Sequence, residues 1–362
     1  MKTTVKTSLF FIVLLAAVLI VEAQMIRIKQ VNLKQFPEIS AIISVESETG
    51  KPIPVDTRGL LLYENGKPIQ GVRVVPLDSR QLPIYTVVII DKSGSMKGTP
   101  IKKAREAAGK FVEMMRGQDR AAYIEFDTQV KIAAKFTGDP AAVIGKIRET
   151  RVGSDTALLD AVWQGVELFK SVPEDGVKVI LVLTDGKENR STRTLDEVIR
   201  KARDNQVSVF SVGLGENIDE KMLKKMAGQT EANYYHAPRP DRLADIYRNI
   251  SLLLHSQLLM RFKTPFSMDD QWHRLRVEVP YMGRVVSGEK PYLSARESRI
   301  PTELLKRIRR EENRKLARQQ RQIERKEKNE HRLIILLSVI LGILMLVLIL
   351  VMIRRGKGKK RG

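Results

Sequence analysis

Residues 84–96, IYTVVIIDKSGSM, constrain the fold of this chain more than any other stretch. The five β-branched residues at 86–90 predict a strand that is buried on both faces, as in a parallel sheet. A helix is expected next, because apolar residues then recur at helical spacing on one face: Ile101, Ala104, Ala108, Phe111, Val112 and Met115. Asp91, Ser93 and Ser95 therefore lie on a strand-to-helix turn at the carboxyl edge of a sheet, where open α/β sheets bind ligands. Three oxygen donors on one tight turn indicate a hard cation such as Mg²⁺.

Strands and helices alternate through residues 81–254, which predicts an α/β domain with a doubly wound, Rossmann-like, mostly parallel sheet. The further strands are expected at 121–126, 130–136 (an edge hairpin partner), 178–184, 207–212 and 234–235. Three further helices are expected at 140–149, 195–205 and 241–254. Another is expected to run from the loop that contains Thr156 to about residue 172, and one more is expected to begin at about residue 219. Thr156 lies in a loop that opens a helix, and Asp185 directly follows a buried strand. Both are expected at the same rim as Asp91, where the strand ends of such a sheet converge.

Three motifs occur in the order and spacing of a known family: DKSGSM at 91–96, the loop that contains Thr156, and TDG at 184–186. Together they resemble the metal-ion-dependent adhesion site of von Willebrand factor type A domains. The resemblance covers roughly residues 82–254, about half of the chain. It implies a domain that binds another protein through a metal ion.

By this resemblance, Ser93, Ser95 and Thr156 offer hydroxyl oxygens to the ion directly, whereas Asp91 and Asp185 act largely through water. Mg²⁺ is the expected cofactor, with Mn²⁺ or Ca²⁺ as alternatives. Because few anions bind the ion directly, it stays electrophilic, and a vacant position can accept a carboxylate. The expected partner is therefore a protein that supplies an acidic residue to the metal.

The simplest alternative for Asp91, Ser93 and Ser95 is that they cap the following helix, as such residues commonly do. Capping does not require Thr156 or a second strand-end carboxylate at Asp185, so the metal site is favoured. Other chemistries lack their motifs in this sequence: an EF-hand, a phosphate-binding P-loop, a nucleophile elbow, and zinc-ligand spacing among the histidines. We therefore expect no enzyme activity.

Three functions can be ranked on these observations. The leading hypothesis is a membrane-anchored, metal-dependent module for protein binding or adhesion. The second is a structural or assembly factor of the cell envelope that uses the same fold without metal, and loss of partner capture with a chelator would distinguish the two. A metal-assisted hydrolase ranks third, because no general base accompanies the expected ligands.

Residues 24–80 and 255–300 flank the α/β domain with strand patterns. The strands are expected at 39–47, 60–63 and 72–75 before the domain and at 256–264, 273–280 and 284–287 after it. Asn65-Gly66 predicts a hairpin turn in the first segment. That segment alone is too small to close a core. The pattern resembles a bacterial branch of the family in which the metal-binding domain is inserted into an immunoglobulin-like β-sandwich, so the two segments are expected to be its halves.

The two ends of the chain predict export and anchoring. Residues 1–23 combine early lysines with an apolar run and a small residue at Ala23, which is typical of a signal peptide; an uncleaved anchor is the alternative. Residues 333–353 carry no charge and, at ~1.5 Å per residue, can span the ~30 Å hydrocarbon core as a transmembrane helix. A charged helical stalk is expected at 301–332 and a basic cytoplasmic tail at 354–362.

These segments predict a single-pass protein of the cell membrane, with its main domains in the periplasm or outside the cell. The formal net charge is +21, but much of the excess lies at 306–332 and 354–361. We expect no nucleic-acid partner, because binding one needs a basic patch on a folded face with a base-reading element. The chain contains no cysteine, so its exported domains must be stabilised by their cores.

Overall fold

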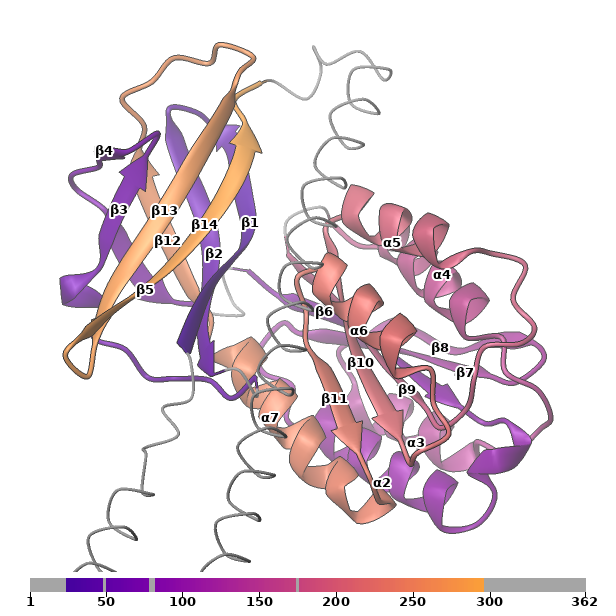
Figure 1. Cartoon of the computed structure of the whole chain (residues 1–362). Coiled ribbons are helices and arrows are strands. Elements are labelled where there is room, and N and C mark those ends of the chain that lie inside the picture. The colour runs from indigo at the N-terminus through magenta and orange to yellow at the C-terminus, as the bar shows by residue number, and fades with distance from the viewer. Residues whose placement is uncertain (1–23, 48–49, 78–81, 174–175, 296–362) are drawn as a thin grey trace, which may run out of the picture. The chain divides into compact units, whose positions relative to one another are not determined.

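The computed structural model describes residues 24–47, 50–77, 82–173 and 176–295 (Figure 1). Four predicted segments lie outside the described residues: the signal peptide at 1–23, the stalk at 301–332, the transmembrane helix at 333–353 and the tail at 354–362. Within the described ranges, no helix has both the length and the apolar character needed to cross a membrane.

A six-stranded sheet forms the centre of the α/β domain, with strand order β11-β10-β9-β6-β7-β8. The strands are β6 (Ile84–Asp91), β7 (Arg120–Phe126), β8 (Val130–Thr137), β9 (Val177–Thr184), β10 (Val207–Leu214) and β11 (Tyr234–Ala237). All neighbouring pairs are parallel except β7 and β8, which are antiparallel as the hairpin pattern predicts. Every residue of β6 is buried. The prediction of a doubly wound, mostly parallel sheet is confirmed.

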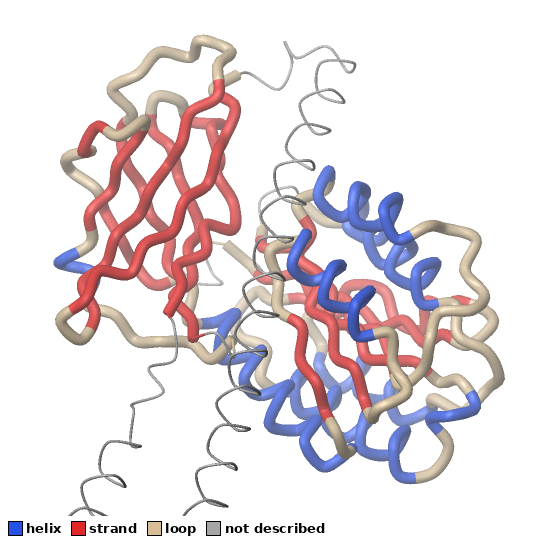
Figure 2. The backbone as a smooth tube through the Cα atoms, in the orientation of Figure 1, coloured by secondary structure: helices blue, strands red, loops and turns tan. Residues whose placement is uncertain are grey.

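Helices cover both faces of this sheet (Figure 2). One face carries α2 (Thr99–Glu113), α3 (Pro140–Glu149) and α7 (Leu243–His255); the other carries α4 (Leu158–Leu168), α5 (Leu195–Asp204) and α6 (Glu220–Gln229). Short 3-10 turns complete the fold: η1 (Thr57–Gly59), η2 (Gly94–Met96), η3 (Phe169–Ser171) and η4 (Pro240–Arg242). The helix expected to reach about 172 ends at Leu168 and continues as η3, because Pro173 disfavours helical geometry in the residue before it.

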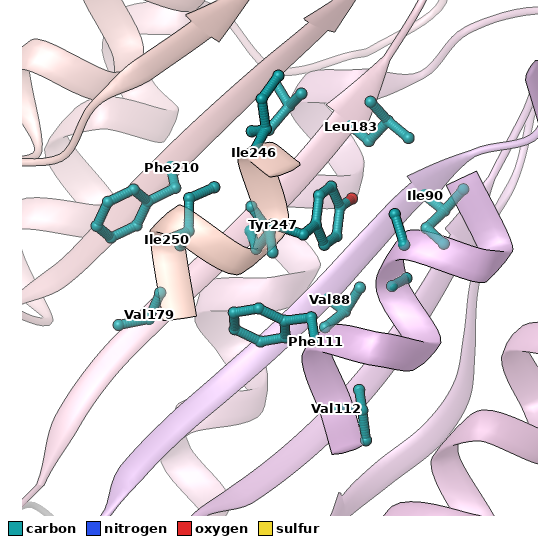
Figure 3. Packing of buried hydrophobic residues seen from close by; sticks show 14 of the residues in the cluster. Val88, Ile90, Phe111, Val112, Val179, Leu183, Phe210, Ile246, Tyr247 and Ile250 are labelled. Carbon is teal, nitrogen blue, oxygen red and sulfur yellow. The ribbon is translucent and has the colours of Figure 1, made fainter. Parts of the chain in front are cut away.

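The core on the α2 and α7 side is shown in Figure 3. Val88 and Ile90 of β6 point into it, whereas Val87 and Ile89 belong to the core on the opposite face. They alternate in this way because successive side chains of a strand point to opposite faces of the sheet. Both faces of β6 are therefore packed into apolar cores, and Asp91 lies at the end of the strand, where the candidate site is.

The second part of the described chain is a β-sandwich of two four-stranded sheets. One sheet has the order β1 (Gln24–Gln35), β2 (Glu38–Ser47), β12 (Leu258–Lys263), β5 (Arg73–Pro76); the other has the order β14 (Arg284–Leu293), β13 (Trp272–Tyr281), β3 (Leu61–Glu64), β4 (Lys67–Pro68). Each sheet combines strands from before and after the α/β domain, and the orange strands lie among the indigo ones in Figure 1. Residues of both sheets share one apolar core.

Two local features of the sandwich bear on the sequence predictions. Asn65 and Gly66 both have positive φ, 50° and 79°, and connect β3 to β4, so the predicted hairpin turn is confirmed. The strand β1 was not predicted, although Ile26 and Ile28 alternate with basic residues and are buried. Such an alternation of apolar and polar residues is typical of a strand with one buried face, and it could have predicted β1.

Candidate metal centre

Asp91 is the last residue of β6, and its side chain is fully buried. Its Oδ1 accepts a hydrogen bond from the Ser93 backbone N–H at 2.8 Å, and its Oδ2 accepts one from the Thr184 hydroxyl at 2.6 Å. Burial raises the pKa of Asp91 to about 6, and the nearby charge of Asp185 acts in the same direction. The Ser93 N–H and the Thr184 hydroxyl are both neutral donors. No Lys, Arg or His of the described chain forms an ion pair with this carboxylate.

Hydroxyl groups link Asp91 to the second strand-end carboxylate. The Ser93 Oγ lies 3.2 Å from the Ser95 Oγ, and the Ser95 Oγ donates to Asp185 Oδ1 at 2.7 Å. Asp185 follows β9, which is the parallel neighbour of β6. Burial raises the pKa of Asp185, although the hydrogen bond from Ser95 opposes this shift. The carboxyl ends of two adjacent strands therefore present two carboxylates and two serine hydroxyls to one region.

Thr156 joins this group from the loop before α4, and its side chain is buried. A Cβ atom added to Gly186 would lie 3.1 Å from the Thr156 Oγ1 and 3.9 Å from the Ser95 Oγ. Both hydroxyls therefore lie beside the backbone of the residue that follows Asp185. The structure thus brings the five sequence-predicted residues to the same rim of the sheet.

Main-chain hydrogen bonds hold the loop after β6 against the loop that carries Thr156. The Gly94 N–H donates to the Ser154 carbonyl at 2.7 Å, and the Gly153 N–H donates to the Lys92 carbonyl at 2.6 Å. A Cβ atom at Gly153 would lie 1.8 Å from Asp127 Oδ2, so any larger residue at this position would displace the Asp127 carboxylate. Asp127 is held in turn by an ion pair of 2.5 Å with Lys92.

Two residues that the sequence does not single out also position the ligands. The Asn189 N–H donates to the Thr156 carbonyl at 3.2 Å, and the Thr156 N–H donates to Asn189 Oδ1 at 3.1 Å. Glu188 accepts from the Leu159 N–H at 2.9 Å and from the Ser191 N–H at 2.7 Å, which fastens the loop after β9 to the start of α4. Asn189 is 33 residues from Thr156 and Glu188 is 29 residues from Leu159, so a local motif search has no signal for these two contacts.

The capping alternative for Asp91, Ser93 and Ser95 does not hold. The helix α2 starts at Thr99, and its N-cap is Gly98, which forms no side-chain cap. The η2 turn begins after Ser93, whose side chain also caps no backbone N–H. The hydroxyls are directed instead toward each other and toward Asp185.

The donor set suits a hard cation, because it consists of hydroxyl and carboxylate oxygens around a buried charge. No three His, Cys, Asp or Glu side chains among the described residues lie close enough together to hold a metal by themselves. An ion at this rim would therefore depend on the hydroxyls of Ser93, Ser95 and Thr156, as the sequence motifs imply.

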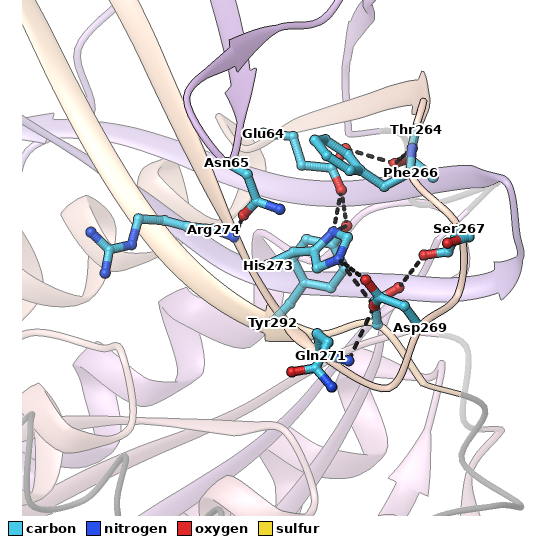
Figure 4. A network of polar contacts seen from close by, with 11 residues as sticks. Glu64, Asn65, Thr264, Phe266, Ser267, Asp269, Gln271, His273, Arg274 and Tyr292 are labelled. Atoms are coloured by element: carbon cyan, nitrogen blue, oxygen red, sulfur yellow. Dashed lines mark hydrogen bonds and ion pairs between the residues drawn. The ribbon is translucent and has the colours of Figure 1, made fainter.

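A second buried carboxylate lies in the sandwich, and there the protein supplies the partners (Figure 4). Glu64 is fully buried at the end of β3. Its Oε1 lies 2.8 Å from His273 Nδ1 and accepts from the Tyr292 hydroxyl, while its Oε2 accepts from the Thr264 hydroxyl at 2.7 Å. His273 Nε2 lies 3.2 Å from Asp269 Oδ1. Burial and the hydrogen bond to Glu64 raise the pKa of Tyr292.

Comparison with known proteins identifies the family of the α/β domain. Residues 86–249 match the von Willebrand factor type A domain family. An uncharacterized protein of Synechocystis sp. is 24% identical over 176 residues, which are 47% of this chain and 41% of the relative. Human inter-alpha-trypsin inhibitor heavy chain H4 is 29% identical over 160 residues, which are 40% of this chain and 17% of the relative.

The solved structure of a von Willebrand factor type A protein from Catenulispora acidiphila aligns with a TM-score of 0.47 and 15% identity, over 78% of this chain and 77% of its own. The match to each of the two sequence relatives above spans less than half of that relative's length. The family match itself covers the strands, the helices and all three loops of the candidate site. The central segment of this chain is therefore a von Willebrand factor type A domain.

Proposed function

We propose that this chain binds a divalent cation at Asp91, Ser93, Ser95, Thr156 and Asp185, and that it uses this site to capture a partner protein through an acidic side chain. The proposed ion is Mg²⁺, with Mn²⁺ or Ca²⁺ as alternatives. One observation carries the proposal. Asp91 is fully buried, yet within the described part of the chain it accepts hydrogen bonds only from neutral donors. A buried carboxylate is costly unless a cation or several strong donors compensate it.

The residues of the site divide into two roles in this proposal. Ser93, Ser95 and Thr156 would hold the ion through their hydroxyls, while Asp91 and Asp185 would balance its charge and order its water. A bound divalent ion supplies an electrophilic position for a carboxylate of the partner. We propose binding and not catalysis, since each side chain of the site is accounted for as a ligand or as the support of a ligand.

We also propose that the protein is anchored in a cell membrane by residues 333–353, with the metal domain on the exported side and residues 354–362 in the cytoplasm. The sequence carries this part of the proposal, through the uncharged run of 333–353 and the signal-like residues 1–23. The sandwich, which we propose to be immunoglobulin-like, would join the metal domain to the anchor at two points of the chain instead of one.

Calorimetric titration of the detergent-solubilised full chain with MgCl₂ tests the metal site. We expect one ion per chain for the parent and no binding heat for Asp91→Ala. The matched control is Asp56→Ala, which removes an exposed carboxylate of the sandwich and should bind Mg²⁺ like the parent. If Asp91→Ala binds Mg²⁺ like the parent, the proposal is wrong.

Affinity capture from solubilised membranes, with and without EDTA, tests the partner. Partner protein should be retained with Mg²⁺ and released by the chelator. If capture is unchanged by EDTA while calorimetry shows a bound ion, the metal is not the means of capture. The function would then be that of a metal-independent structural or assembly factor of the envelope.

A further inference from the structure

Each of the three loops that carry the candidate ligands also presents one exposed cation without a partner among the described residues. Lys97 lies two residues after Ser95, Arg151 lies five residues before Thr156, and Lys187 lies two residues after Asp185. In the described part of the chain, none of these three cationic side chains forms a hydrogen bond, an ion pair or a contact with an aromatic ring.

The neighbouring charges on the same loops are already paired. Lys92 forms an ion pair with Asp127 at 2.5 Å, and Arg190 forms one with Asp155 at 3.0 Å. Glu188 is occupied by backbone N–H groups. The pairing therefore leaves a surplus of positive charge on the ligand loops, at Lys97, Arg151 and Lys187.

A groove of about 510 Å³ extends this positive surface away from the site. Its lining includes Lys92, Arg151, Lys131 of β8 and Lys146 of α3. Lys131 and Lys146 are each paired with a glutamate at 2.9 Å. Arg151 is therefore the cation of this groove that has no carboxylate partner among the described residues.

This surplus cannot serve to hold a metal ion, because like charges repel and three unpaired cations oppose the approach of a divalent cation. The same charges favour an anion that arrives at the rim. Complementary charge across an interface raises the association rate and selects among partners. The arrangement thus suits a partner that carries more negative charge than the single carboxylate of the proposed metal contact.

We propose that the partner's binding segment is acidic beyond the one residue that meets the metal, with further carboxylates that pair with Lys97, Arg151 and Lys187. This inference rests on the proposed function and specifies its partner class. The loop after β10 carries the exposed carboxylate of Glu216, which would repel an acidic segment of the partner. The acidic segment therefore lies over the ligand loops and the groove, away from Glu216.

The probes are two fluorescein-labelled peptides of equal length, one with a single aspartate in a Gly-Ser background and one with that aspartate flanked by two glutamates on each side. Fluorescence anisotropy measures their binding to the full chain in MgCl₂ at low and high NaCl. We expect the acidic peptide to bind at least about tenfold more tightly at low salt, and the difference to shrink at high salt because exposed charges are screened.

The test variant replaces the three unpaired cations: Lys97→Gln, Arg151→Gln and Lys187→Gln. It should lose the preference for the acidic peptide, while calorimetry shows Mg²⁺ bound at least as tightly as in the parent. The matched control carries the same loss of charge at exposed positions elsewhere: Lys51→Gln, Arg248→Gln and Lys263→Gln. The control variant should keep the preference.

The outcomes separate this inference from the proposed function. If the parent binds Mg²⁺ but both peptides bind equally, or if the test variant keeps the preference, the inference is wrong and the metal site stands. If the parent binds no Mg²⁺, the proposed function is wrong and the inference falls with it. A preference that disappears equally in the test and control variants would reflect total charge and would also overturn the inference.

Discussion

Asp91 in the α/β domain and Glu64 in the sandwich are both fully buried carboxylates, but their surroundings differ. Glu64 is met by the imidazole of His273, which can carry a positive charge, and by two hydroxyl donors. Asp91 is met by neutral donors, which are the Ser93 backbone N–H and the hydroxyls of Thr184 and Ser93. Burial is therefore not what distinguishes a candidate functional carboxylate here. The distinguishing feature is that Asp91 has no cationic partner among the residues that the structure describes.

The two clusters also have different consequences for stability. A buried charge that is fully paired can be retained as part of the packed structure, whereas an unpaired one destabilises the folded state until something binds it. Substitution of each carboxylate by its amide keeps the size of the side chain and removes the charge. The amide variants therefore give the most direct contrast between the two regions.

The largest expected effect is on metal affinity. Asp91→Asn should weaken Mg²⁺ binding by about 100-fold or more, because the neutral amide no longer balances the charge of the ion or orders its water. Glu64→Gln should bind Mg²⁺ like the parent. Calorimetric titration of the two variants measures both affinities, and an equal loss in both would remove the contrast.

The second effect is on stability, where Glu64→Gln should destabilise the protein and Asp91→Asn should stabilise it. Glu64→Gln should lower the free energy of unfolding by about 3 kcal/mol, because it leaves His273 and its donors without their carboxylate. Asp91→Asn, measured without metal at pH 7, should raise the free energy of unfolding by roughly 1 to 3 kcal/mol, since burial of the charge no longer opposes folding. Urea unfolding of the ion-free proteins tests both signs, and a destabilised Asp91→Asn would contradict this account.

The Asp91 site could be predicted from the sequence because its signal is local. The run at 86–90 predicts a buried strand, and Asp91, Ser93 and Ser95 follow it within five residues. Parallel topology then places Asp185 beside Asp91 through the pairing of β6 with β9. The structure agrees with both inferences about the sheet.

The Glu64 cluster could not be predicted in the same way. Its partners Thr264, His273 and Tyr292 lie 200, 209 and 228 residues away in the chain. His273 and Tyr292 meet Glu64 because β13 pairs with both β3 and β14, whereas Thr264 reaches it from the end of β12 in the other sheet. Strand periodicity identifies such strands individually, but it does not determine which distant strand will be the neighbour of another. The Asn189 contacts with Thr156 escaped prediction for the same reason.

The pH dependence of metal binding should reflect the unusual state of Asp91. Its pKa in the ion-free fold is about 6, above its usual value of 3.8, so the fold favours the protonated form. The stability of the ion-free protein should therefore fall as the pH rises from about 4 to 6, and Asp91→Asn should remove this slope. Mg²⁺ requires the carboxylate, so its affinity should fall about tenfold per unit below pH 6. Calorimetry from pH 5 to 8 checks the trend; an affinity that does not change over this range would contradict it.

The smallest effect is expected at the neutral ligand. Thr156→Ala removes one hydroxyl that water can replace, so Mg²⁺ affinity should fall by about tenfold or less. Thr156→Ser keeps the hydroxyl and serves as the control. A loss at Thr156→Ala as large as that of Asp91→Asn would show that charge balance is not the main contribution of the protein to this site.

We propose that a divalent ion, and not a protein side chain, compensates the buried charge of Asp91. Anomalous scattering from crystals of the chain grown with MnCl₂ tests it most directly, because the position of the ion is then observed. We expect a peak among the hydroxyl oxygens of Ser93, Ser95 and Thr156, and no peak at Glu64. A peak elsewhere in the molecule, or no peak beside Asp91 at saturating Mn²⁺, would contradict it.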